Sequence, residues 1–156
     1  MPNYRILLTV ILTSLSLSSL ANSDDQKTTN IMQPIKNLFD GMREHDSSKI
    51  LQQFTESALL QRTDKKGNVT STDIQQFARN ISQSLVFLDE QLLDQVVLQQ
   101  DSLASVWTPF AFYIDGKLSH CGSNSFQLVK QNTQWKIHYL IDVSHNGDCQ
   151  AIIHAY

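Results

Sequence analysis

The sequence predicts an α+β fold in which helices cover one face of an antiparallel sheet. In the first half of the chain, apolar residues recur at helical spacing, whereas after residue 103 they fall in long runs rich in β-branched and aromatic side chains. Two turn sequences, Asp115-Gly116 and Gln131-Asn132-Thr133, divide that second half into three strands. Residues 103–144 therefore form an antiparallel meander, and the segments before them cover its apolar face.

Two helices open the predicted domain. Asn30 is placed to cap the first helix, which starts at residue 31 and holds Pro34 in its first turn, where the missing N–H costs little. Its apolar stripe consists of Ile31, Ile35, Leu38, Phe39 and Met42. Asp46 is a good N-cap for a second, short helix. Both helices present one apolar side to the sheet.

A strand, a third helix and a further strand precede the meander. Residues 57–62 match a short strand, and a turn follows at residues 64–68. The sequence Thr72-Asp73-Ile74-Gln75 has the form of a capping box, and the helix that it opens carries apolar residues as far as Leu85. Residues 91–100 follow as a strand that leads into the meander.

The first residues have the pattern of a secretory signal peptide. Arg5 is followed by an apolar run from residue 6 to 20, and small residues, Ala21 and Ser23, precede a cleavage point before Asp24. Cleavage after Ala21 and an uncleaved membrane anchor are the alternatives. The sequence thus predicts a signal peptide over 1–23, a flexible segment over 24–30, one domain over 31–150 and a tail over 151–156. The protein would be exported, either periplasmic or secreted.

Composition excludes several kinds of partner. The chain carries 12 basic and 15 acidic side chains, a formal net charge of −3, and no basic cluster. Such a chain has no electrostatic footprint for nucleic acid. We also predict no metal, no cofactor and no membrane contact after signal cleavage.

Two cysteines, Cys121 and Cys149, are the only thiols of the chain. In an oxidising compartment we expect one disulfide between them. By the chain-entropy model, closing a loop of about 29 residues stabilises the fold by about 3.5 kcal/mol. A redox pair is the alternative, although such pairs usually have Cys-x-x-Cys spacing.

The register of the two hairpins predicts which side chains of the meander lie on each face of the sheet. Regular two-residue turns pair Ala111 with His120, Trp107 with Asn124 and Phe126 with Tyr139. The face toward the helices then contains a predicted ligand pocket formed by Trp107, Tyr113, His120, Asn124 and Tyr139. This face holds no Asp or Glu. A β-bulge would flip part of the assignment.

The polar groups of the inner face allow two interpretations. His120 and Asn124 are either satisfied members of a filled core or the groups that orient a ligand in a cavity. On the outer face, an apolar patch predicts a symmetric homodimer. That predicted dimer face consists of Val106, Phe110, Phe112 and Leu140.

The ordered set of elements resembles the nuclear transport factor 2-like (NTF2-like) superfamily, in particular its SnoaL-like members. The resemblance covers residues 31 to 144 and rests on the two opening helices with Asp46 between them, the strand SALLQR, the third helix and the meander ending in WKIHYLIDV. It implies an exported, bacterial-type member whose curved sheet wraps around three N-terminal helices as a cone with a pocket. Homodimers through the outer sheet face are frequent among such proteins.

The resemblance implies several possible chemistries. Ketosteroid isomerase-like members use a Tyr on the first helix, which this chain lacks there. Epoxide hydrolase-like members use an Asp-Arg-Asp set, and Arg62 would lie near the pocket mouth without acids on the predicted inner face. Dehydratase- and cyclase-like members use a pocket His with Asp or Tyr, which leaves His120 as the candidate catalytic residue.

Three functions follow from this reasoning. The first is a non-enzymatic domain that binds a small apolar or aromatic ligand or serves as a dimeric accessory module. The second is a His120-dependent enzyme of the dehydratase, cyclase or isomerase kind. The third is a structural dimer module with a filled core. An open pocket with His120 hydrogen-bonded to Asp142 or a Tyr favours the second, although the predicted register places Asp142 on the outer face.

Overall fold

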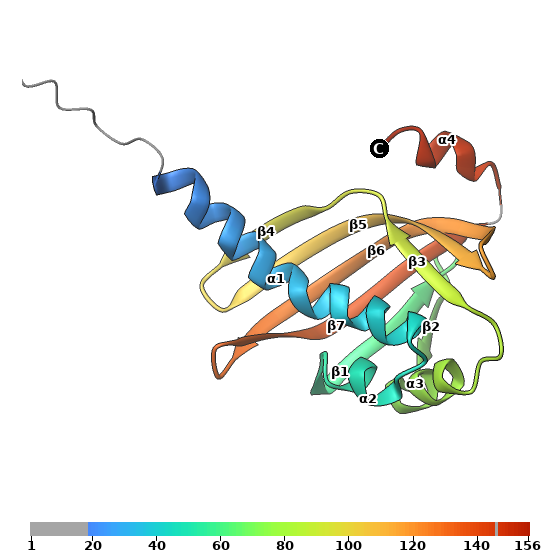
Figure 1. Cartoon of the computed structure of the whole chain (residues 1–156), viewed down its shortest axis with the longest axis horizontal. Helices are drawn as coiled ribbons and strands as arrows, with labels where there is room; N and C mark the ends of the chain where they lie inside the picture. The colour runs from blue at the N-terminus through green and yellow to red at the C-terminus, as the bar shows by residue number, and fades with distance from the viewer. Residues whose placement is uncertain (1–18, 146) are drawn as a thin grey trace, which may run out of the picture.

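The chain folds into a curved, unclosed mixed sheet whose N-terminal helices lie on one face, which confirms the α+β prediction (Figure 1). The computed structural model describes residues 19–145 and 147–156. Most of the predicted signal peptide lies outside these residues. The predicted cleavage point before Asp24 falls within the first helix.

The helices are α1 (Ser19–Arg43), α2 (Ser47–Leu51), α3 (Ile74–Ser82) and α4 (Cys149–Ile153). The strands are β1 (Phe54–Thr63), β2 (Val69–Thr72), β3 (Leu88–Leu92), β4 (Val96–Gln100), β5 (Leu103–Ile114), β6 (Lys117–Gln131) and β7 (Gln134–His145). Their order across the sheet is β2-β1-β7-β6-β5-β3, and β4 also pairs with β5. All neighbouring strands are antiparallel except β1 and β7, which run parallel. The sequence predicted the three long strands and missed β2.

Helix α1 lies across the sheet and buries the predicted apolar stripe against it (Figure 1). It begins well before residue 31, so the prediction of a flexible segment over 24–30 is wrong. Pairs of side chains one helical turn apart support this extension, such as Gln26 with Asn30 and Lys27 with Asp24. Pro34 therefore lies inside the helix rather than in its first turn, and it cannot donate to the carbonyl of Asn30.

Two irregularities control the register of the meander. The pairing of β5 with β6 shifts between Phe112 and Tyr113, and that of β6 with β7 shifts between Gln127 and Leu128. The pairs predicted next to the two turns, Ile114 with Lys117 and Leu128 with Ile137, are confirmed, whereas the three predicted pairs beyond the shifts are wrong. In the structure Ala111 lies opposite Cys121, Trp107 opposite Ser125 and Phe126 opposite Leu140. Each shift exchanges the face on which the following side chains lie.

The central strands pack closely where Phe110 crosses Gly122. These two residues are directly opposed, and Phe110 is buried. A Cβ atom at residue 122 would lie 2.0 Å from the carbonyl oxygen of Val143 and 2.8 Å from Phe110 Cζ. Only glycine fits this position, because a side chain would displace a neighbouring strand.

The predicted C-terminal tail forms a short helix, α4, that contacts β5 and β6. The disulfide between Cys121 and Cys149 confirms the predicted pairing, with a Cα–Cα distance of 5.7 Å. Cys121 and the neighbouring Ala111 are fully buried. The disulfide thus holds the C-terminal helix against the middle of the sheet.

Within residues 19–145 and 147–156, no helix has both the length and the apolar character needed to cross a membrane.

Replacing both cysteines by Ser should lower the free energy of unfolding by about 2–4 kcal/mol, because the loop closed in the denatured chain is lost. Denaturant unfolding of the variant and of the unreduced protein measures this difference. Thiol titration of the denatured, unreduced protein should give no free thiol. Two thiols per chain would contradict the disulfide.

Candidate functional site

A cavity of about 210 Å³ lies between the helices and the sheet. Its apolar wall consists of Phe39, Met42, Leu60, Phe77, Ile81, Phe112 and Leu140. Its polar groups are Arg62, Glu90, His120, Asn124 and Asp142. The cavity is therefore mainly apolar with a small number of convergent polar groups, the composition expected of a small-molecule site.

Four adjacent strands bring the polar groups together in one row. Arg62 on β1 lies opposite Asp142 on β7, which lies opposite Asn124 on β6, which lies opposite Thr108 on β5. Directly opposed residues point to the same side of a sheet. Arg62 and Asp142, which are 80 positions apart in the chain, thus meet because β1 and β7 are neighbours.

A second row crosses the sheet beside the first. His120 on β6 lies opposite Phe112 on β5, and Phe112 lies opposite Glu90 on β3. Asn124 joins the two rows, because its amide Nδ2 donates to Glu90 Oε1 at 2.7 Å and to Thr108 Oγ1 at 3.4 Å. Asn124 is buried, and these bonds fix its orientation.

Arg62 and Asp142 form a bidentate ion pair at the cavity. Arg62 Nε donates to both carboxylate oxygens at 3.1 and 2.8 Å, and Nη2 lies 2.6 Å from Oδ2. The Asp142 side chain is 10% exposed, whereas that of Arg62 is 58% exposed. The hydrogen bonds that Arg62 donates to Asp142 raise the pKa of Arg62. A negative charge is thereby held inside the cavity, with its partner facing solvent.

Glu90 lies in an environment that disfavours its charged form, whereas Asp142 has a cationic partner. Its carboxyl group is desolvated, and this burial raises its pKa to about 8, although the hydrogen bond from Asn124 acts to lower it. The negative charge of Asp142 raises it further, while Arg62 lowers it. Glu90 therefore carries a proton at neutral pH and can donate a hydrogen bond.

His120 lies half-buried between aromatic rings. Its ring stacks on Phe112 at a centroid distance of 4.8 Å and meets the edge of Phe110 at 5.9 Å. Burial lowers its pKa, the charge of Arg62 lowers it further and Asp142 opposes both effects. Nδ1 lies 3.1 Å from Ser119 Oγ. The imidazole is thus neutral at pH 7.

The structure places two of the five predicted pocket residues, His120 and Asn124, at the cavity. The other three, Trp107, Tyr113 and Tyr139, lie on the opposite face because the register shifts move them there. Trp107 is 46% exposed. Tyr139 donates its hydroxyl to Gln61 Oε1 at 2.8 Å on that face.

The predicted dimer face is wrong for the same reason. Val106 and Phe110 are buried beneath the helices, whereas Phe112 and Leu140 line the cavity. A surface formed by these four side chains is not available to a second copy.

Sequence reasoning missed Glu90 and placed Asp142 on the outer face, naming it only as a possible partner of His120, so it concluded that no acid lies near Arg62. Asp142 was assigned to the outer face because the shift at Gln127 and Leu128 has no marker in the sequence. Glu90 lay just outside the predicted strand, which begins at Leu88 in the structure. Had the predicted strand been extended by a few residues toward the N-terminus, Glu90 would have been part of the strand that pairs with the meander.

Comparison with known proteins identifies the fold of this chain but no sequence family. No protein-family model matches the chain, and no curated protein matches it. An NTF2-like protein of unknown function from Shewanella baltica is 16% identical, with a TM-score of 0.60 over 78% of this chain and 95% of that one. This chain has the NTF2-like fold.

Two further structures with this NTF2-like fold are described as candidate dehydratases. One, from the NTF2-like family of Streptomyces avermitilis, is 12% identical, with a TM-score of 0.65 over 78% of this chain and 98% of that one. The other, a candidate scytalone dehydratase from Novosphingobium aromaticivorans, is 10% identical, with a TM-score of 0.66 over 81% and 89% of the two chains. At these identities the likeness extends to the fold alone.

The described residues also bear on metal binding. Over 19–145 and 147–156, no group of three or more His, Cys, Asp or Glu side chains is placed to hold a metal ion.

Glu90 makes stability depend on pH. Its folded-state pKa of about 8 lies above the ordinary value of 4.5, so the unfolded chain binds fewer protons between these values. The free energy of unfolding should fall as pH rises through this window, by up to about 1.4 kcal/mol per pH unit, and level off above it. Glu90→Gln should remove this contribution and gain stability relative to wild type toward pH 8.

Denaturant unfolding across the window measures this difference. Glu56→Gln, at an exposed position on β1, is the matched control and should follow the wild-type curve. Parallel curves for wild type and Glu90→Gln would contradict the protonated state of Glu90.

Proposed function

We propose that the cavity binds a small, uncharged, mainly apolar molecule bearing a hydroxyl or carbonyl group and transfers a proton on it. The reaction class is dehydration or isomerisation. One observation carries the proposal: a protonated Glu90 and a neutral His120 line the same cavity beside the Arg62–Asp142 ion pair. Titratable groups whose environments push their pKa values apart are the pattern expected of an acid and a base.

Cavity size and lining support this ligand class. A dry cavity of about 150 Å³ is enough for benzene, so 210 Å³ accommodates a somewhat larger molecule, of about ten non-hydrogen atoms. The aromatic and aliphatic wall favours a hydrophobic body. A charged anion would meet the carboxylate of Asp142, and a neutral oxygen would accept a hydrogen bond from protonated Glu90.

His120 is the base in this proposal. In the tautomer that this role requires, Nδ1 carries the proton and donates it to Ser119 Oγ, so Nε2 can accept a proton from the substrate. The imidazolium that forms is stabilised by the negative charge of Asp142, which raises the His120 pKa. Stacking on Phe112 holds the ring in place.

Glu90 is the acid. In a dehydration, His120 takes a proton from carbon, the C–O bond breaks, and the departing hydroxyl takes the Glu90 proton to leave as water. The proton on His120 then returns to Glu90, which restores both groups. In an isomerisation, Glu90 donates its proton to a carbonyl oxygen while His120 removes a proton from the adjacent carbon, which gives an enol. The enol then returns its O–H proton to Glu90 and takes the proton from His120 at another carbon, which restores both groups.

Two further inferences concern the setting of the enzyme. Export is supported by the leader-like sequence and by the disulfide, which persists in oxidising compartments. A homodimer is supported by an exposed apolar patch on the outer sheet face, formed by Val96, Leu98, Leu103 and Trp107. This patch replaces the dimer face predicted from sequence.

Proton transfer can be detected before the substrate is known. A panel of small hydroxylated and carbonyl compounds is incubated with the protein in D₂O, and deuterium incorporation or loss of water is followed by NMR. At least one compound should react, and Glu90→Gln or His120→Gln should each lower its rate by about 10²-fold or more.

Tyr139→Phe is the matched control, since Tyr139 lies on the opposite face and should leave the rate unchanged. Compounds that raise the melting temperature without any exchange would indicate binding alone. That outcome would overturn the enzyme and favour the ligand-binding domain.

Trp107→Asp should convert the proposed dimer to a monomer, because a charge would be buried in the interface. Light scattering after size exclusion gives the mass. Leu118→Asp, at the β5–β6 turn, is the control and should remain dimeric. A wild-type protein that is monomeric at high concentration would reject the dimer.

A further inference from the structure

A second hollow lies far from the cavity, between α1, the end of α2 and the β6–β7 turn. It has a volume of about 440 Å³, within the range of ligand sites. Unlike the cavity, it is mainly polar. Its lining includes six side-chain amides, from Asn30, Gln33, Asn37, Gln52, Gln53 and Gln134. We refer to it as the amide groove.

Hydrogen bonds hold several of these amides in fixed positions. Gln33 Nε2 donates to Asn37 Oδ1 at 2.9 Å, and Asn37 Nδ2 donates to Gln53 Oε1 at 3.3 Å. Gln53 Nε2 in turn donates to the carbonyl of Lys49 at 2.7 Å, and Gln53 is 8% exposed. This series of hydrogen bonds leaves the side-chain oxygen of Gln33 and the second N–H of each amide group available to a ligand. The groove is therefore preorganised rather than a loose surface depression.

Helix α1 contributes a backbone acceptor as well. Pro34 has no N–H, so the carbonyl of Asn30 lacks its usual helical donor. Both residues line the groove. The proline thus adds an oxygen that can accept from a ligand hydroxyl.

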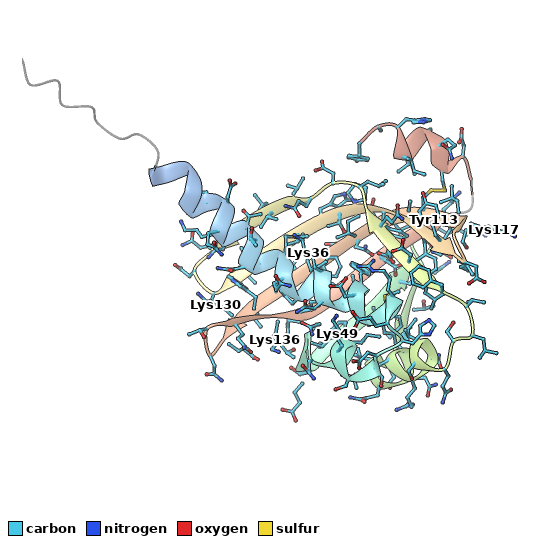
Figure 2. The ribbon with its side chains drawn as sticks, viewed as in Figure 1. Lys36, Lys49, Tyr113, Lys117, Lys130 and Lys136 are labelled. Carbon is cyan, nitrogen blue, oxygen red and sulfur yellow. A yellow bond between two sulfur atoms is a disulfide. The ribbon has the colours of Figure 1, made fainter. Side chains whose placement is uncertain are left out.

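The charge of the groove is positive within a negatively charged protein. Lys130 and Lys136 line it, and no carboxylate does. Figure 2 shows both lysines at the β6–β7 end of the sheet beside α1. Among the described residues, Lys130 Nζ has no ion pair or hydrogen bond, and Lys136 Nζ donates to the carbonyl of Gln52. Both ammonium groups retain N–H donors for an anion.

We propose that the amide groove binds an acidic sugar, a hydroxyl-rich ring that carries a carboxylate. Side-chain amides both donate and accept, as sugar hydroxyls do. Lys130 and Lys136 would pair with the carboxylate. Pro34 and Trp135 supply a small apolar surface for the C–H groups of the ring.

An acidic peptide fits the groove less well. Peptides commonly add to a free sheet edge or insert apolar side chains into a hydrophobic groove. Here β6 and β7 are paired with each other along the turn, and the lining is mainly polar. The sugar is therefore the occupant that the geometry favours.

The fluorescence of Trp135, which lines the groove, can report ligand binding there directly. The chain has two tryptophans, and Trp107 lies on the outer sheet face, so Trp107→Phe leaves Trp135 as the only tryptophan. Adding glucuronate or a galacturonate trimer should change its fluorescence saturably, whereas glucose should not. Stronger binding of the trimer identifies a polysaccharide as the source, and equal binding identifies the free sugar.

Substitutions locate the site. Lys130→Gln with Lys136→Gln should weaken glucuronate binding at least about tenfold, as expected when charged hydrogen bonds are lost. Lys130→Gln alone should weaken it in the same direction, and it breaks no side-chain hydrogen bond or ion pair among the described residues. Lys117→Gln, at the opposite end of the sheet, is the matched control and should bind normally (Figure 2). Glu90→Gln should also bind normally, which separates this test from that of the cavity.

Several results would overturn the proposal. One is the absence of any fluorescence change with glucuronate and with the galacturonate trimer. Another is a fluorescence change with glucose or acetate as large as that with the acidic sugars. The third is a dissociation constant for glucuronate that is unchanged in both lysine variants. Tighter binding of triglutamate than of the galacturonate trimer would replace the sugar by an acidic peptide.

Discussion

The register of the three central strands is the constraint on which the rest of the structure depends. Because side chains alternate between faces, a shift of one residue moves every following side chain to the other side of the sheet. Two shifts, near Phe112 and near Leu128, turn Thr108, Asn124 and Asp142 toward the helices. Close packing of Phe110 on Gly122 fits this register, because no side chain is possible at residue 122. The cavity therefore contains acids that a regular meander would expose to solvent.

Two carboxyl groups in one cavity have different protonation states because their partners differ. Asp142 has a guanidinium as its partner, whereas Glu90 has a neutral amide and a desolvated position. Two negative charges so close together would repel, and the protonation of Glu90 avoids this cost. The same arrangement leaves one group able to donate a proton and one able to stabilise a developing positive charge on His120. The proposed chemistry follows from this asymmetry rather than from His120 alone.

The cavity and the amide groove are suited to different ligands. The cavity is small, mainly apolar and contains a buried negative charge, so it favours a neutral hydrophobic molecule. The groove is larger, polar and lined by lysines without any carboxylate, so it favours a hydroxylated anion. Helix α1 serves both sites. Residues two positions apart lie on nearly opposite sides of a helix, so Phe39 and Met42 line the cavity, whereas Gln33 and Asn37 line the groove.

The amino-acid sequence alone determined the three long strands, the positions of the first three helices with their apolar stripes, the two hairpin turns and the disulfide partners. Those features depend on local preferences and on apolar periodicity, which are written in neighbouring residues. The sequence also placed His120 and Asn124 at the cavity. Which acids join them was decided only by the tertiary structure, because register shifts arise from how strands pack and leave no local signature. Arg62 and Asp142 lie 80 positions apart in the chain and meet through the parallel pairing of β1 with β7. The extension of α1 before residue 30 was also decided by the tertiary structure and not by the cap pattern. Asn30 can lie inside a helix when side chains on both sides of it stabilise that helix.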